Sequence, residues 1–476
     1  MSEKMLIIHG YSDSSVSFES LRDFFVEQLK MDKKDVFHTD YASMDDQATF
    51  RDFADKLDAD YSKHFDKGER INVACHSTGA LVVRSWLALR RQRQIELGLK
   101  IDCPVKRILF FAPANFGSDL ASMGQSVLGR LRSTFFNPFS YKAEDFFESG
   151  KIVLQGLEPA SPFQWELSEM DLHGFDYFSD NEDENLTCYP FVFAAGFDYA
   201  DKAESFVVKA RKKPGTDGTV RICGTNLNTR KCTIDFLSPG RPAKVKWHKE
   251  KKFNHIPFAV FHEMNHGSLI EANKAPFKRK IGPKPLVKKA MSVNSPDEYL
   301  EVAEKFREIN EKNYLKAEGR YKDRYQQFFF SVRDDVDRSV EDYYIHFYVD
   351  NGLTGDKKNE ISKLSHEIDD QLNKKYYKHS ADPSCRVLML KLNSLSEMQV
   401  TLNQSKARLI MEVSAASPLP NISYKTGIFV VYDGTKKEGE GTSFLYPNTT
   451  TLVDLILNRQ QTDKLINLKD HNLKPL

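Results

Sequence analysis

The chain has 476 residues, a length that indicates two domains rather than one simple core. Its formal net charge of +1 argues against a general nucleic-acid binder, while 40% hydrophobic and 28% charged residues are ordinary for a globular protein. The six cysteines show no CxxC spacing and no paired clustering, so we predict no disulfides and a reducing compartment.

The apolar run near the N-terminus, residues 5–9, is far too short for a signal peptide. No stretch of the sequence reaches membrane-spanning length. We therefore expect a cytoplasmic protein, or one that is exported by a system that needs no cleaved signal peptide.

Short apolar runs alternate with helical patterns over residues 1–273. Residues 15–30 and the segment around 50–57 carry apolar side chains at helical spacing. Continuous apolar runs such as 105–112 are typical of buried parallel strands. The alternation predicts an α/β fold with a mostly parallel sheet covered on both faces. The expected strands are residues 5–9, 36–40, 71–75, 105–112, 190–195 and 258–263.

The alternation is lost over residues 118–188, which are rich in aromatic side chains and end in an acidic tract at 180–185. We interpret this segment as an insertion that forms a cap or lid over an active site. An extra packing layer without a gating role is the alternative.

A second, β-rich domain is predicted over residues 296–476. Residues 274–295, rich in Lys, Pro and Ala, are interpreted as a linker, and the sequence Ser-Pro-Asp-Glu at 295–298 favours a helix that runs to about residue 319. The strands that follow predict a β-sandwich-like accessory domain that binds the substrate surface, a protein partner or a second copy of the chain. The strand candidates are 325–332, 342–349, 387–392, 407–413 and 426–432, with a polar helical stretch at about 357–375.

The most informative motif is Cys75-His76-Ser77-Thr78-Gly79, which lies between an apolar strand and a helical run. A strand, a sharp turn with Ser at its tip and a helix form the nucleophile elbow of α/β-hydrolases. Cys75 stands where Gly is usual, but its side chain is small enough for such a turn. Ser77 is therefore the predicted nucleophile.

A serine nucleophile needs a histidine base and an orienting acid, and in the α/β-hydrolase fold the acid follows the serine in the chain and the histidine comes last. Asp217 lies in the Gly-flanked turn 215–220, and His266 lies in a turn directly after the strand predicted at 258–263. Order and local context favour this pair. The alternatives are Asp201 and Asp235 for the acid, and His255 and His262 for the base.

An oxyanion also needs hydrogen-bond donors. One is expected to be the backbone N–H of Thr78, directly after the nucleophile, and the other that of Tyr11, in the loop after the first strand, where Gly10 lets the backbone approach. We interpret His76 as a packing residue beneath the elbow. This chemistry requires no metal and no cofactor, and no HExxH-type spacing is present.

Together these residues resemble the lipase-like branch of the α/β-hydrolase superfamily, which includes lecithin–cholesterol acyltransferase-like and glycosylphosphatidylinositol-deacylase-like enzymes. Residues 111–121, FAPANFGSDLA, look like the strand-end motif T-P-x-x-G-S-x-L-A of that branch, with Ala112 in place of Thr, and the run 215–220 resembles its acid loop. The resemblance covers residues 1–273. It implies that the nucleophile, acid and base are Ser77, Asp217 and His266, with Tyr11 and Thr78 as oxyanion donors.

The expected function is hydrolysis of carboxylic esters through an acyl-enzyme, by a lipase or phospholipase. A short-chain carboxylesterase, an acyltransferase and an inactive hydrolase-fold binding module are the alternatives. Basic tracts could attract anionic lipid, at about 1 kcal/mol per residue, and give peripheral membrane contact, or they could be solvated loops. These tracts are residues 211–213, 249–252, 278–280 and 288–289.

Overall fold

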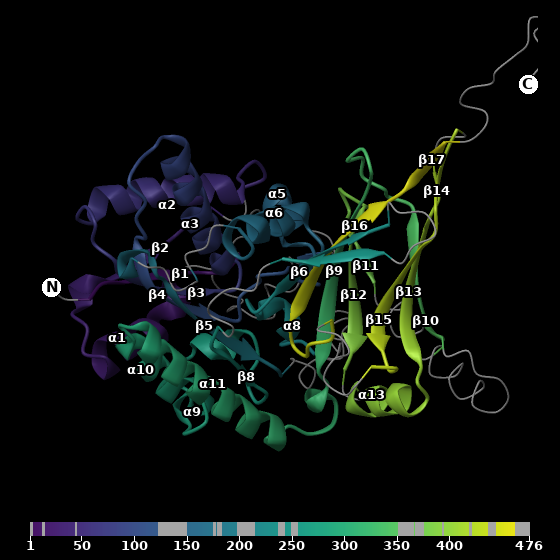
Figure 1. Ribbon diagram of the computed structural model, residues 1–476. Coiled ribbons are helices and arrows are strands. Elements are labelled where there is room, and N and C mark those ends of the chain that lie inside the picture. The colour runs from purple at the N-terminus through teal and green to yellow at the C-terminus, as the bar shows by residue number, and fades with distance from the viewer. Residues whose placement is uncertain are drawn as a thin grey trace, which may run out of the picture. The chain divides into compact units, whose positions relative to one another are not determined.

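A computed structural model of the chain (Figure 1) divides into two compact units, one of Met1–Thr229 with Lys249–Asp323 and one of Arg230–His248 with Arg324–Leu476. Each unit is described by itself. The structure describes residues 3–11, 15–42, 45–121, 150–174, 178, 183–197, 215–236, 243–248, 256–350, 366, 376–392, 395–417, 421–436 and 444–461.

A six-stranded sheet forms the centre of the first unit, in the order β2-β1-β3-β4-β5-β8. Every neighbouring pair is parallel, and β1, β3 and β5 are buried along their whole length, as is typical of parallel strands that are mostly apolar. The predicted mostly parallel α/β sheet is confirmed. Its strands are β1 Met5–Ile8, β2 Val36–Thr39, β3 Ile71–His76, β4 Val105–Phe111, β5 Tyr189–Ala195 and β8 Phe258–Phe261.

Helices cover both faces of this sheet, with α2 and α3 on one face and α1, α10 and α11 on the other (Figure 1). The second group packs with the sheet in one buried core that includes Phe25, Phe191, Leu286 and Phe306. The helices are α1 Glu19–Gln28, α2 Phe50–His64, α3 Gly79–Glu96, α8 Ile222–Thr225, α9 Ala275–Lys278, α10 Pro283–Ser292 and α11 Pro296–Lys316, with short 3-10 turns η1 Ser15–Phe18, η2 Lys33–Asp35, η5 Glu184–Leu186, η6 Gly267–Ile270 and η7 Gly319–Lys322.

The boundary of the first unit differs from the predicted one. The segment interpreted as a linker, 274–295, contains α9 and α10, and α10 buries Leu286, Val287 and Ala290 while residues 288–289 are exposed. The helix predicted to begin at 296 is α11, which belongs to the first unit, because Tyr299 and its neighbours pack into the core of that unit. The segment has the Lys and Pro content of a linker, so its composition gave no indication that α10 has an apolar face.

Part of the predicted cap is helical, in α5 Lys151–Leu157 and α6 Pro162–Asp171. The fully buried Arg84 of α3 forms a bidentate ion pair with Asp171 of α6, at 2.7 and 2.9 Å, which joins this region to the helix after Ser77. Residues 122–149, 175–177 and 179–182 of the predicted cap lie outside the described residues, so its gating role stays a prediction.

The second unit is β-rich, as the sequence predicts. A six-stranded sheet, β11-β12-β9-β16-β6-β7, and a three-stranded sheet, β10-β13-β15, contribute to one buried core, which is the arrangement of a β-sandwich. A small pair, β14-β17, completes the described strands. Its elements are β9 Tyr325–Asp334, β10 Tyr343–Asp350, β11 Tyr377–Lys378, β12 Cys385–Lys391, α13 Leu395–Gln404, β13 Arg408–Ala415, β14 Ile422–Tyr424, β15 Gly427–Asp433, β16 Thr450–Leu457 and β17 Arg459–Gln461.

Two further strands of this unit come from the middle of the chain, a feature that the sequence analysis missed. They are β6 Arg230–Asp235 and β7 Lys244–Trp247, and β6 pairs parallel to β16. The predicted split at residue 296 is therefore too simple. The polar helical stretch predicted at 357–375 lies outside the described residues, except for residue 366. Within the described part of the chain, no helix has the length and apolar composition needed to cross a membrane.

Candidate active site

Ser77 lies at the tip of the turn between β3 and α3, with a φ of 54° that side chains other than glycine rarely adopt. Backbone hydrogen bonds hold this conformation: the Ser77 N–H donates to Phe111 O at 3.1 Å, and Ala114 N–H donates to Ser77 O at 3.1 Å. The geometry is that of a nucleophile elbow, a strained turn that places the serine at the end of a strand, and Ser77 is 8% exposed there.

The two flanking positions of the motif have different steric demands. A Cβ on Gly79 would lie 2.5 Å from His9 O and 2.8 Å from Ile8 O, so only glycine fits there. Cys75 is a residue of β3 and has ordinary strand pairing with Ile8 and Phe110, which explains why a side chain is tolerated in place of the usual glycine. Burial raises the pKa of the Cys75 thiol well above its ordinary value, which keeps it neutral and unreactive.

Replacing Gly79 by alanine is expected to destabilise the protein by about 3 kcal/mol, because the new methyl group overlaps two backbone carbonyl oxygens that cannot move without shifting β1. Urea denaturation measures this loss. Gly98→Ala is the control: Gly98 has a φ of 62° but open space around it, so only backbone strain of about 1 kcal/mol is expected. Equal losses in the two variants would contradict the steric argument.

Asp217 and His266 are brought together although 48 residues separate them in the chain. Asp217 Oδ2 accepts a hydrogen bond from His266 Nδ1 at 2.8 Å, and the carboxylate is 1% exposed. Its other oxygen, Oδ1, accepts from the N–H groups of Thr219 and Val220 at 2.9 and 2.8 Å. The turn therefore holds the carboxylate in one orientation, and the Nδ1–H bond leaves Nε2 of His266 as the basic nitrogen.

His266 is joined to the elbow through His76, a contact that the sequence analysis missed. His76 Nε2 donates to the backbone carbonyl of His266 at 3.1 Å, and the two ring centroids are 4.6 Å apart. Within the described residues, no hydrogen bond links the Ser77 hydroxyl to the imidazole of His266. Such bonds commonly tighten only in the substrate complex. His76 thus binds the backbone of His266, in addition to packing beneath the elbow.

Burial lowers the pKa of His76 well below its ordinary value of 6.5, and the neighbouring His266 lowers it further. Only the unfolded chain then takes up a proton at His76, so its contribution to stability is complete above about pH 6.5 and is lost as the pH falls below that value. A neutral His76 keeps its Nε2–H donor directed at His266.

Replacing His76 by phenylalanine is expected to lower kcat about tenfold or more with little change in KM, because the ring is kept but the donor to the base loop is lost. His76→Gln, which retains an N–H donor, should recover part of kcat, and both variants should flatten the loss of stability below about pH 6.5. Steady-state kinetics and melting temperatures from pH 5 to 8 measure these effects. An unchanged kcat in His76→Phe would exclude the positioning role.

The loop after β1 approaches Ser77 closely. A Cβ on Gly10 would lie 3.0 Å from Ser77 Cβ, so glycine brings this backbone next to the elbow and places Tyr11 directly after the contact. His9 holds the loop, since its Nδ1 donates to Gly10 O at 2.7 Å and its Nε2 accepts from Tyr41 N–H at 3.2 Å. The His9 and Tyr41 rings also stack, with centroids 4.3 Å apart. Sequence order carries no signal for the Tyr41 contact.

Thr78, the other predicted oxyanion donor, is the N-cap residue of α3 and is 1% exposed. The N–H groups at a helix N-terminus point out of the helix and favour negative charge. Thr78 and the Gly10–Tyr11 backbone thus flank Ser77 from two segments, the arrangement expected of an oxyanion hole.

The acid turn is tied to the loop that follows β4. Ser118 Oγ donates to Thr219 O at 2.6 Å, and Arg221 forms an ion pair with Asp119 at 2.6 Å between partly buried side chains. Both contacts join the motif at 111–121 to the turn that carries Asp217. Both segments carry recognisable sequence motifs, but no sequence pattern indicates that they are in contact.

The rival residues lie elsewhere or outside the described residues. His262 follows β8 and contacts Tyr314, with ring centroids 6.4 Å apart. Asp235 is a residue of β6 in the second unit. Asp201 and His255 lie outside the described residues, so those two alternatives stay open.

No family model matches the chain, and no curated protein sequence matches it. Among solved structures, phospholipase PlaB from Legionella pneumophila is similar, with a TM-score of 0.78, 20% identity, and coverage of 100% of this chain and 97% of that one. PlaB in complex with thio-NAD is similar with a TM-score of 0.76 and the same identity and coverage. This likeness confirms the α/β-hydrolase fold with its added β-rich part.

Proposed function

We propose that this protein is a serine hydrolase of carboxylic esters, of the lipase or phospholipase class. The observation that supports it most is the buried Asp217–His266 pair, at 2.8 Å, beside an elbow that carries Ser77 at a φ of 54°. This combination matches a nucleophile, a base and an orienting acid. Because the similar Legionella protein is named a phospholipase, phospholipids come first among the substrates to test.

In the proposed reaction, His266 Nε2 takes the proton of the Ser77 hydroxyl as its oxygen attacks the ester carbonyl carbon. The negative charge on the carbonyl oxygen is stabilised by the N–H groups of Thr78 and Tyr11, at about 3 kcal/mol for each donor. When the intermediate collapses, the carbon–oxygen bond to the alcohol breaks, and the alcohol leaves with the proton from His266. Water then attacks the acyl-enzyme by the reverse sequence and releases the acid.

A panel of substrates tests the proposal: short-chain p-nitrophenyl esters, triglycerides and phosphatidylcholine vesicles, with released fatty acid as the readout. Labelling by a fluorophosphonate probe reports separately whether the serine is reactive. Labelling without hydrolysis of any ester would favour acyl transfer, which product analysis with added alcohol acceptors detects. Neither labelling nor hydrolysis would overturn the proposal and favour an inactive binding module.

Contact with a lipid surface is a further part of the proposal. Of the basic tracts, residues 278–280 and 288–289 have exposed side chains in the first unit, which supports electrostatic attraction to anionic lipid. Residues 211–213 and 249–252 lie outside the described residues. Sedimentation with anionic and zwitterionic vesicles at low and high salt measures this contact.

A further inference from the structure

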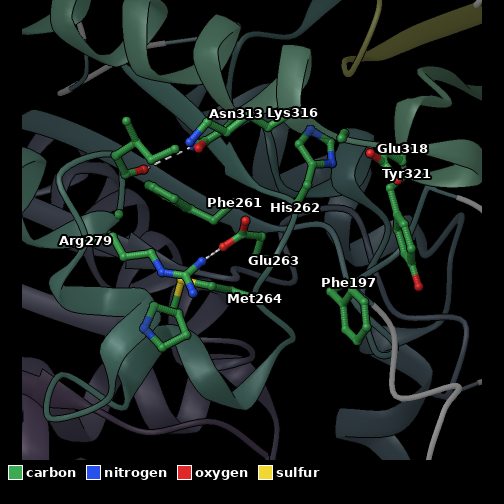
Figure 2. Close-up of a pocket in the computed structure, with 14 residues that line it drawn as sticks. Phe197, Phe261, His262, Glu263, Met264, Arg279, Asn313, Lys316, Glu318 and Tyr321 are labelled. Carbon is green, nitrogen blue, oxygen red and sulfur yellow. Dashed lines mark hydrogen bonds and ion pairs between the residues drawn. The ribbon is translucent and has the colours of Figure 1, made fainter.

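A cavity of about 290 Å³ opens in the first unit, beyond the ends of β5 and β8 (Figure 2). Phe197 follows β5, and His262, Glu263 and Met264 follow β8, while the end of α11 and η7 supply the opposite wall. In parallel α/β sheets, ligands bind at the carboxyl ends of the strands. The cavity lies at this edge, and the nucleophile follows β3 at the same edge.

The floor of the cavity is apolar and held by hydrogen bonds. Phe261 and Met264 are 3% and 2% exposed. Asn313 Nδ2 donates to Val260 O at 3.1 Å and to Ile281 O at 3.3 Å, and Phe197 N–H donates to Met264 O at 2.9 Å. These bonds connect β8, α11 and the loop after β5, so the cavity is formed before any ligand enters.

The walls of the cavity carry opposite charges at its two ends. Phe197 and Tyr321 stack with centroids 5.1 Å apart, and Glu318 lies beside Tyr321 (Figure 2). Arg279 lies on the opposite side, in an ion pair with Glu263. Lys316, at the end of α11, adds a second positive charge that has no ion pair within the described part of the chain.

We propose that this cavity binds a zwitterionic phosphate ester that carries a quaternary ammonium group, of the phosphocholine type. Aromatic faces next to a carboxylate attract quaternary ammonium, and the C-terminus of α11 favours positive charge. Lys316 and Arg279 attract the phosphate. A ligand with only a negative charge would be repelled by Glu263 and by the C-terminus of α11. A ligand with only a positive charge would be repelled by Lys316 and Arg279. A ligand that carries both charges therefore fits best.

The cavity shares a loop with the proposed base. Met264, in the cavity floor, precedes His266 by two residues, and its backbone carbonyl is bound by Phe197 N–H. A ligand in the cavity therefore contacts the segment that positions His266. The zwitterionic group could be the headgroup of a lipid or a free glycerophosphodiester. Binding of the zwitterionic ligand does not depend on the proposed hydrolysis. Only the interpretation of this ligand as the headgroup of a lipid substrate rests on the proposed function.

Isothermal titration of the full-length protein with phosphocholine tests the inference, with choline chloride and inorganic phosphate as half-ligands. Phosphocholine should bind about tenfold more tightly than either half-ligand, and Tyr321→Leu or Lys316→Gln should weaken it about tenfold. Lys312→Gln, on the same helix but outside the cavity lining, is the matched control and should leave the affinity unchanged. No binding by the wild type, or an equal loss in Lys312→Gln, would overturn the proposal.

Kinetics separate the two sources of the ligand. If the headgroup of the substrate binds, Lys316→Gln raises KM for phosphatidylcholine about tenfold and leaves triglyceride hydrolysis unchanged. If a free glycerophosphodiester binds, glycerophosphocholine changes the rate of wild-type p-nitrophenyl ester hydrolysis, and Lys316→Gln abolishes that effect without altering KM for phosphatidylcholine. Phosphocholine binding without any ester hydrolysis would overturn the proposed function alone, whereas hydrolysis without binding would overturn this inference alone.

Discussion

Replacing Ser77 by alanine is expected to reduce kcat for ester hydrolysis by about 10⁶-fold, because no other group at the elbow can form the acyl-enzyme. Cys75 cannot substitute for the serine, since its thiol is fully buried in β3 and its pKa is raised by burial. The folded state should change little, as the substitution removes one hydroxyl group and leaves the backbone hydrogen bonds of the turn in place. Initial rates with p-nitrophenyl butyrate and the melting temperature measure both effects.

Ser85→Ala is the matched control for this experiment. Ser85 lies in α3, is 2% exposed, and its buried hydroxyl has no hydrogen-bond partner within the described residues. Its loss should leave both activity and fluorophosphonate labelling intact. Hydrolysis that persists at the wild-type rate in Ser77→Ala would refute the proposed nucleophile, whatever the stability of the variant.

Replacing Asp217 by asparagine is expected to lower kcat by about 10⁴-fold. The Asn oxygen can still accept from the N–H groups of Thr219 and Val220, which leaves its amide NH₂ facing His266 Nδ1. An NH₂ donor there stabilises the tautomer that is protonated on Nε2, so the imidazole can no longer take the proton of Ser77. The turn and the position of the imidazole are therefore expected to be unchanged in Asp217→Asn, while His266 no longer acts as a base.

Asp235→Asn tests the rival acid and is expected to retain wild-type kcat, because His266 Nδ1 is bonded to Asp217, while Asp235 is paired with Lys244 in the ladder of β6 and β7. Circular dichroism and melting temperatures confirm that each variant is folded. A drop of less than tenfold in Asp217→Asn, or an equal drop in Asp235→Asn, would remove Asp217 from the proposed mechanism.

The sequence predicted well those features whose signal is local. The apolar runs of β3 and β4 predicted buried parallel strands, and the glycines that flank Asp217 predicted a turn, in which Gly215 and Gly218 have φ of 73° and 93°. In each case the structure depends on a few neighbouring residues. A strand that is buried on both faces must be mostly apolar, and a residue at positive φ is preferentially glycine. The catalytic roles of Ser77, Asp217 and His266 remain proposals on that basis.

Predictions from composition were wrong where apolar residues are few and widely spaced. The region at 274–295 has the Lys and Pro content of a linker, yet α10 buries one face against the core of the first unit. The strands β6 and β7 are short and partly polar, and they form only because β16, more than two hundred residues later, supplies the hydrogen bonds on one side of β6. No local pattern contains that information.

By itself, the sequence determined the parallel α/β sheet, the elbow and the turns that carry Asp217 and His266, because each depends on the burial or backbone freedom of adjacent residues. Only the tertiary structure decided that His76 holds the backbone of His266, that His9 and Tyr41 support the Gly10 loop, and that the ends of β5, β8 and α11 enclose a charged cavity. These features are contacts between segments that are distant in the sequence. Such contacts stabilise the protein only after folding has brought the partners within hydrogen-bond distance.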